Sequence, residues 1–89
     1  MIRPATTTFT LGAMLRQERE RRGLTQAELA ERSGVSRQLL IKIEKGHPGA
    51  EIGKIMAIVK ALGGGVVFEE LPPSPPSAFD LDQIIWGEK

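Results

Sequence analysis

The 89-residue chain contains no cysteine and only one histidine, His47. Without cysteine it can form no disulfide, no thiol nucleophile and no cysteine-based zinc site. A single histidine leaves too few ligands for a histidine-rich metal site and no spare partner for a serine–histidine triad. The composition therefore argues against an enzyme, and we expect neither a metal nor a cofactor.

Long apolar segments are also lacking. No uncharged stretch approaches the roughly 20 apolar residues of a membrane span, and the N-terminal segment lacks the apolar region of a signal peptide. We therefore expect a cytoplasmic protein without a membrane partner. A chain of this length buries only around 60–65% of its unfolded surface, so a lone monomer would be marginally stable. Oligomerisation is one usual remedy.

Charges are unevenly distributed along the chain. The formal net charge is +1, yet residues 1–60 hold eleven lysines and arginines against six acids, and residues 61–89 hold one lysine against five acids. A basic body with an acidic tail predicts a polyanion as one partner and a different partner for the tail. The plainer alternative is a solvated helical surface followed by a solubilising tail.

Capping signals predict two helices in the first third of the chain. Thr10 is predicted to cap the first helix, and Gly23 is predicted to end it in the left-handed conformation. Thr25 and Glu28 form a T-x-x-E capping box, which predicts a short second helix over residues 26–32.

Two further helices follow. Ser36 is predicted to cap a third helix over residues 37–45. A fourth, over residues 51–62, carries an apolar stripe wide enough to be buried on most sides. Met14 and Met56 are interpreted as core filler.

The pattern changes after the triple glycine at residues 63–65. Residues 66–71 are predicted to form a strand, whose bare edge favours pairing with its copy in a second subunit. Which face of that strand is buried stays open, because its alternation is imperfect. The proposed dimerisation residues are Val66, Val67, Phe68 and Leu71.

The prolines after this segment predict a stiff linker and a flexible tail. The expected organisation is an N-terminal arm (residues 1–9), a DNA-binding and dimerisation domain (10–71), and a linker with tail (72–89). The tail is interpreted as a recognition segment, or alternatively as an unused extension. Its apolar candidates for recognition are Phe79, Ile85 and Trp86.

Only Ser33, Gly34 and Val35 lie between the second predicted helix and Ser36, the cap of the third, which is the spacing of a helix-turn-helix. Gly34 supplies the positive φ of the turn, and Val35 forms its apolar plug. Such a turn holds one helix across the DNA backbone while the next enters the major groove. The third helix would then present to base edges the side chains of Ser36, Arg37, Gln38 and Lys42. Taken singly, each could be merely an exposed helix residue.

An ion pair is expected between the first and third helices. Arg19 follows Leu11 and Leu15 at helical spacing and so shares their face, while Glu44 lies on the face of Leu40. Opposite charges on facing apolar sides should pair, so we predict contact between Arg19 and Glu44.

Residues 11–46 resemble the helix-turn-helix of the Xre/Cro family of phage and bacterial repressors. The matching marks are Leu11-Gly12, Leu15-Arg16, Gly23-Leu24-Thr25-Gln26, Glu28-Leu29-Ala30, Gly34-Val35-Ser36, Leu40 and Ile43-Glu44-Lys45-Gly46. The resemblance implies an all-α, lambda-repressor-like bundle of four or five helices, here with one short C-terminal strand that pairs across a dimer. It also implies that Gln26 fixes the second helix to phosphate or an end base. The candidate DNA-binding residues are Gln26, Ser36, Arg37, Gln38, Lys42 and Lys45.

Beyond residue 62 the chain is similar to HipB-type antitoxins, because a single strand is followed by a tail that contains Trp86. Those proteins repress their own operon as dimers and bind a HipA-type kinase toxin. The resemblance therefore implies three partners, namely a palindromic operator in double-stranded DNA, a second copy of the chain, and a HipA-type toxin. The alternative is a stand-alone Xre-family regulator without a toxin partner.

Overall fold

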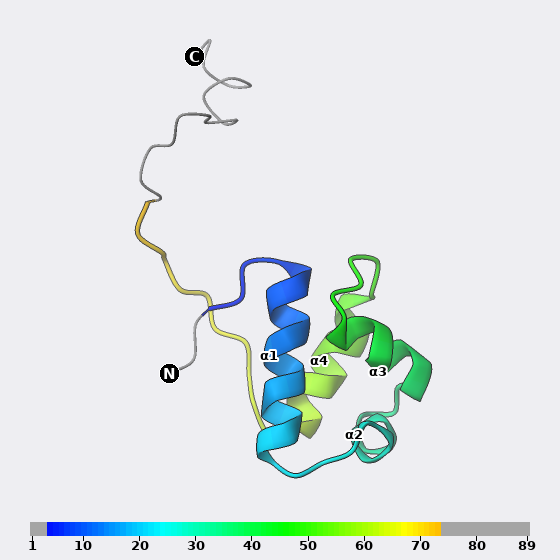
Figure 1. Cartoon of the computed structure of the whole chain (residues 1–89). Helices are drawn as coiled ribbons and strands as arrows, with labels where there is room; N and C mark the ends of the chain where they lie inside the picture. Colours follow the sequence, from blue (N-terminus) through cyan, green and yellow to red (C-terminus); the bar gives the residue numbers. More distant parts are fainter. Residues whose placement is uncertain (1–3, 74–89) are drawn as a thin grey trace.

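The computed structural model describes residues 4–73, and in that range the chain is all-helical. It contains four helices, α1 (Thr8–Arg21), α2 (Gln26–Ser33), α3 (Arg37–Glu44) and α4 (Ile52–Ala61). Helix α1 packs on α3, and α2 packs on both α3 and α4. Figure 1 shows α3 on the right of α1 and α4, with α2 below α3 at the end of a short connection. The predicted all-α bundle is confirmed for these residues.

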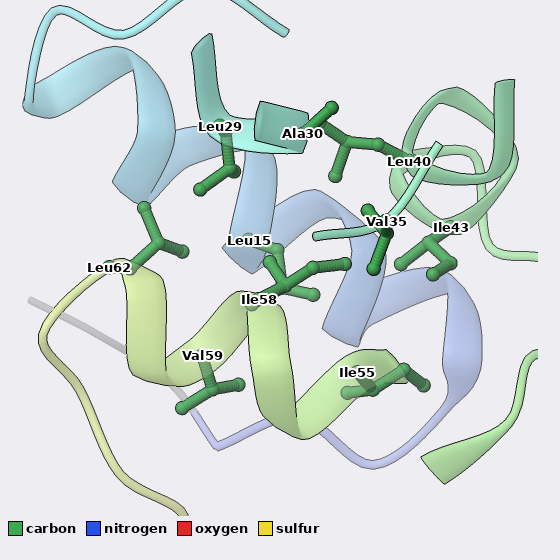
Figure 2. Close-up of a cluster of buried hydrophobic side chains, with 10 residues drawn as sticks. All are labelled: Leu15, Leu29, Ala30, Val35, Leu40, Ile43, Ile55, Ile58, Val59 and Leu62. Carbon is green, nitrogen blue, oxygen red and sulfur yellow. The ribbon is translucent and has the colours of Figure 1, made fainter. Parts of the chain in front are cut away.

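One apolar core joins the four helices. Leu29 of α2, Leu40 of α3 and Ile58 of α4 are completely buried, and Leu15 of α1 is 4% exposed. Figure 2 shows these side chains converging between the helices, with Val35 of the turn among them. Burial of one such side chain stabilises the fold by about 1.5–3 kcal/mol. The core therefore holds α3 by its buried face, which carries Leu40 and Ile43, and its opposite face is exposed to solvent.

Helix α1 begins earlier than the sequence suggests. Its N-cap is Thr7, whose side chain accepts a hydrogen bond from the Thr10 amide at 3.0 Å, while the Thr10 hydroxyl accepts one from the Thr7 amide at 3.0 Å. The prediction that Thr10 caps this helix is therefore wrong. The physical reason is that Thr10, three residues after the cap, closes a reciprocal capping box that satisfies two backbone donors.

The other two caps lie where the sequence predicts them. The Thr25 hydroxyl accepts a hydrogen bond from the Glu28 amide at 3.0 Å, and the Glu28 carboxylate accepts one from the Thr25 amide at 2.8 Å. The hydrogen bonds from Thr25 lower the pKa of Glu28 because they favour its charged form. At α3, the Ser36 hydroxyl accepts a hydrogen bond from the Leu39 amide at 3.1 Å. Both helices of the motif thus begin at fixed positions.

Helix α4 is buried on one side only. Its buried side chains, Ile55, Ile58 and Val59, form a single helical stripe, whereas Ile52 is 71% exposed and Met56 42% exposed. The prediction of a helix buried on most sides is wrong, as is the interpretation of Met56 as core filler. The reason is that α2 is the main helix packed on α4, so the opposite face of α4 receives no comparable cover from the described residues.

The described part of the segment after α4, residues 62–73, contains no further helix or strand. Residues 66–71 form no β-ladder within residues 4–73, and Figure 1 shows this segment running away from the helices. The predicted strand and its pairing across a dimer therefore stay a prediction. No helix among the described residues is long and apolar enough to cross a membrane.

Candidate nucleic-acid interface

The connection between α2 and α3 has the geometry of a helix-turn-helix. Gly34 ends α2 in the left-handed conformation, with φ of 76°, which a residue with a side chain rarely adopts. Val35 follows and is 7% exposed, so it anchors the turn to the core. Because this anchor and the caps fix both helices, α3 is held at a defined angle to α2.

The outer face of α3 is polar and basic. The side chains of Arg37 and Gln38 lie at its exposed first turn, and Lys42 continues the same face one turn later. Arginine can contact guanine bidentately and glutamine can contact adenine in the same way. All of the candidate DNA-binding residues except Gln26 are exposed, namely Ser36, Arg37, Gln38, Lys42 and Lys45.

The other end of α3 is held by a buried ion pair. Arg19 Nε donates to Glu44 Oε2 at 2.7 Å, and Arg19 Nη2 donates to Glu44 Oε1 at 3.2 Å. Only 10% of the arginine side chain and 3% of the glutamate side chain are exposed. The hydrogen bonds with Glu44 raise the pKa of Arg19, so this guanidinium stays charged. A bidentate pair of this kind fixes orientation as well as charge.

The Glu44 carboxylate also accepts a third hydrogen bond, from a second residue. Gln26 Nε2 donates to Glu44 Oε1 at 3.0 Å, and Arg19 Nη1 donates to the Leu24 carbonyl at 2.8 Å. The first residue of α2 is thus tied through one carboxylate to α1 and α3. Gln26 is half-buried, and its side-chain nitrogen is used in this hydrogen bond within the protein. The sequence did not indicate this bond. Every fully buried side-chain nitrogen or oxygen of the described residues has a hydrogen-bond partner.

A close contact between backbones positions α3 against α1. A Cβ atom at Gly12 would lie 2.2 Å from the Ile43 carbonyl oxygen and 2.9 Å from that of Glu44, so only glycine fits. One turn earlier, the Thr8 hydroxyl donates to the Gly46 carbonyl at 3.0 Å. Sequence reasoning assigned Gly12 no structural role. The available signal was a glycine inside a helical pattern, which often marks close packing.

Exposed ion pairs cover the outer side of α1. Glu18 accepts hydrogen bonds from Arg22 and Arg21, and these lower its pKa, with the larger effect coming from Arg22. Arg16 Nε lies 3.2 Å from Glu20 Oε2. The pair of Arg16 with Glu20 faces solvent, where ion pairs contribute little to stability, whereas the Glu18 side chain is only 17% exposed.

The proposed dimerisation residues are open to solvent in the single chain. The exposed fractions are 67% for Val66, 85% for Val67, 95% for Phe68 and 44% for Leu71. Exposed apolar side chains in consecutive positions are unusual on a monomer surface. The tail candidates Phe79, Ile85 and Trp86 lie outside the described residues.

Comparison with known sequences points to one family. The family model HTH_3, described as helix-turn-helix, matches residues 15–67. An uncharacterised HTH-type transcriptional regulator from Sinorhizobium fredii is 37% identical over 57 residues, which are 64% of this chain and 75% of that protein. Another from Methanothermobacter thermautotrophicus is 46% identical over 50 residues, which are 56% of this chain and 72% of that protein.

Solved structures show the same fold. The clp gene regulator ClgR from C. glutamicum is 33% identical, with a TM-score of 0.63 over 74% of this chain and 85% of that one. The restriction-modification controller protein C.AhdI from Aeromonas hydrophila is 29% identical, with a TM-score of 0.62 over 65% and 88% of the two chains. HipB in a complex with a 20mer is 18% identical, and its TM-score of 0.75 covers 81% of this chain and 100% of that one.

Proposed function

Because the chain belongs to the helix-turn-helix family of transcriptional regulators, we propose that it is a sequence-specific repressor that binds a two-fold symmetric operator as a homodimer. The observation that supports this most directly is the first turn of α3. It projects Arg37 and Gln38 into solvent while its far end is fixed by Glu44. A rigid helix with a free polar end can enter a major groove without rearrangement.

The residues of the interface take two different roles in this proposal. Arg37, Gln38 and Lys42 read base edges, because they share the exposed face of α3. Ser36 lies at the same end of α3 as Arg37 and also faces the base edges, whereas Lys45, at the other end of the helix, contacts the phosphate backbone and sets its register. Gln26 approaches the backbone from the start of α2, with its orientation fixed by the bond to Glu44.

Residues 66–71 supply the dimer in this proposal. Pairing with a second copy would satisfy their free backbone groups and cover the exposed Val67 and Phe68. In sedimentation, a chain truncated after Gly64 should be monomeric or much more weakly associated than the full chain. If the full chain is monomeric at tens of micromolar, the proposed dimer is wrong.

Footprinting tests the DNA-binding function as a whole. Purified full-length protein is titrated onto the DNA upstream of its own gene, at low and at physiological salt. We expect protection of a sequence with two-fold symmetry whose half-sites repeat about one helical turn apart, roughly 10 base pairs, or a multiple of it. Binding without sequence preference at both salt concentrations would contradict a repressor.

The finer proposal is that the protein is the antitoxin of a HipA-type kinase toxin and represses the operon that encodes both. The support is the arrangement of the chain after residue 62, where an apolar segment precedes an acidic tail with Phe79, Ile85 and Trp86. In this proposal residues 10–71 bind DNA and dimerise, which leaves residues 72–89 for the toxin.

The competing candidate is a stand-alone regulator, which the description of both sequence relatives as transcriptional regulators favours. Co-expression with the product of the adjacent gene separates the two candidates. An antitoxin should co-purify with a kinase-like neighbour and suppress its toxicity, and deletion of residues 78–89 should weaken that complex. If the adjacent gene encodes no kinase-like protein, or if this protein does not relieve that neighbour's toxicity, the antitoxin proposal is wrong and the stand-alone regulator is favoured.

A further inference from the structure

A shallow hollow lies beside the proposed DNA-binding face, where α1, α2 and α3 meet. Its volume is about 220 Å³, and it is lined by Arg16, Arg19, Gln26, Ile41, Glu44 and Lys45. Gln26 and Lys45 already belong to the proposed interface. Ile41 of α3 lines the same hollow. The hollow therefore opens on the side of the molecule that would face the DNA backbone.

Most of the charges around this hollow are already paired. Glu44 is neutralised by Arg19 through two hydrogen bonds, and both side chains are buried. Lys45 is exposed and has no carboxylate within 4.0 Å among the described residues. Arg16 is 62% exposed, and its one carboxylate partner in the described residues, Glu20, is 55% exposed. Exposed pairs four residues apart on a helix are weak, so an anion can compete for Arg16.

We propose that Arg16 is a phosphate-binding residue, which leaves Glu20 and holds one backbone phosphate over this hollow when the protein binds DNA, while Lys45 holds a neighbouring phosphate. The ligand is a phosphodiester group, whose two non-bridging oxygens an arginine can contact with two parallel N–H donors. This inference rests on the proposed DNA-binding function and extends its interface to α1. The contact carries no sequence information and adds to the affinity for all DNA sequences alike.

The salt dependence of binding measures this contact. The probe is a labelled duplex of arbitrary sequence and about two helical turns, roughly 20 base pairs, titrated with full-length protein over a series of salt concentrations. Each phosphate neutralised adds about 0.9 to the slope of log affinity against log salt. Arg16→Gln should therefore lower that slope by about one for each subunit bound.

Two variants provide controls. Arg21→Gln removes an equally exposed arginine of the same helix, which pairs with Glu18 and lines no part of the hollow, so it should leave the slope unchanged. Glu20→Gln frees Arg16, and it also removes the 4.0 Å contact between Glu20 Oε2 and Arg19 Nη2. It should raise affinity about twofold, as expected for loss of exposed competing contacts. Equal unfolding midpoints of the variants and the wild type will show that the fold is intact.

The outcomes separate this inference from the function on which it rests. If wild-type protein binds the duplex with the expected salt dependence but Arg16→Gln keeps the wild-type slope, the phosphate contact is wrong and the DNA-binding function stands. If the wild type shows no salt-dependent binding, both fail. A lower slope for Arg16→Gln but not for Arg21→Gln supports the contact.

Discussion

The two ends of α3 lie in opposite surroundings. At its start, Arg37 and Gln38 are exposed. At its end, Ile43 is 3% exposed and Glu44 is 8% exposed, and the backbone touches α1 at Gly12. Eight residues thus combine a fixed end with a free one. In the proposed function, discrimination between bases depends on the free end of α3 and stability of the fold on its buried end, so substitutions should separate the two.

The largest expected effect is at the fixed end. Glu44→Ala leaves the buried guanidinium of Arg19 without its carboxylate and should cost about 3–5 kcal/mol. For a domain of this size, at roughly 4–8 °C per kcal/mol, the melting temperature should fall by more than ~12 °C. Circular dichroism measures it. The matched control is Glu31→Ala on the exposed face of α2, for which we expect less than about 0.5 kcal/mol. Equal, small shifts in both would show that the pair does not hold the helix.

A smaller loss should follow from closing the gap between α1 and α3. Gly12→Ala places a methyl group against the Ile43 carbonyl, and such overpacking typically costs about 1–3 kcal/mol. Gly53→Ala in α4 is the control, because its Cβ would meet nothing within 4 Å. That substitution should stabilise the protein by roughly 0.5–1 kcal/mol, since alanine is the better helix former. Denaturant unfolding of both variants should give opposite signs, and the same sign would contradict the close contact.

At the free end, substitution should change DNA recognition and leave stability unaltered. Arg37→Ala should lose about 1–3 kcal/mol of discrimination at one position of each half-site, because a bidentate base contact is removed. Lys45→Ala, next to the fixed end of α3 but exposed, should instead weaken binding to all sequences and lower the salt slope by about one for each subunit bound. Titration of both protein variants against operators with single-base changes distinguishes a loss of base discrimination from a uniform loss of affinity. If Arg37→Ala keeps the full preference profile, α3 does not read the groove from its first turn.

The smallest effect concerns the capping box that starts α2. Its hydrogen bonds lower the pKa of Glu28 in the folded protein below the ordinary value of 4.5. The Glu28 carboxylate therefore binds a proton more tightly in the unfolded chain than in the folded one. This stability is present above pH 4.5 and is lost as the pH falls through 4.5 toward the folded pKa. Glu28→Gln preserves the box, since glutamine can also close it, but should flatten this acid dependence. Unfolding measured from pH 6 to pH 3, as an approximate range, tests it. An unchanged profile would mean that Glu28 is not a source of the acid sensitivity.

Local patterns in the sequence were enough to place most of the helices and the turn. Thr25, Glu28, Ser36 and Gly34 act on neighbours within three or four residues, so their roles follow from spacing alone. The pairing partners Arg19 and Glu44 could be expected because both lie on apolar faces. The cap of α1 could not be assigned with the same success, because several consecutive threonines offer alternative caps and only the folded chain selects Thr7.

By itself, the sequence determined the helix-turn-helix and the polar character of its second helix, because capping and helical periodicity are short-range effects. Only the tertiary structure decided which faces meet. It placed Gly12 against the end of α3, turned the Gln26 amide onto Glu44, left Ile52 and Met56 exposed, and brought Arg16 beside Lys45. These contacts join residues far apart in the chain, and their geometry depends on how the core packs, which no local pattern encodes.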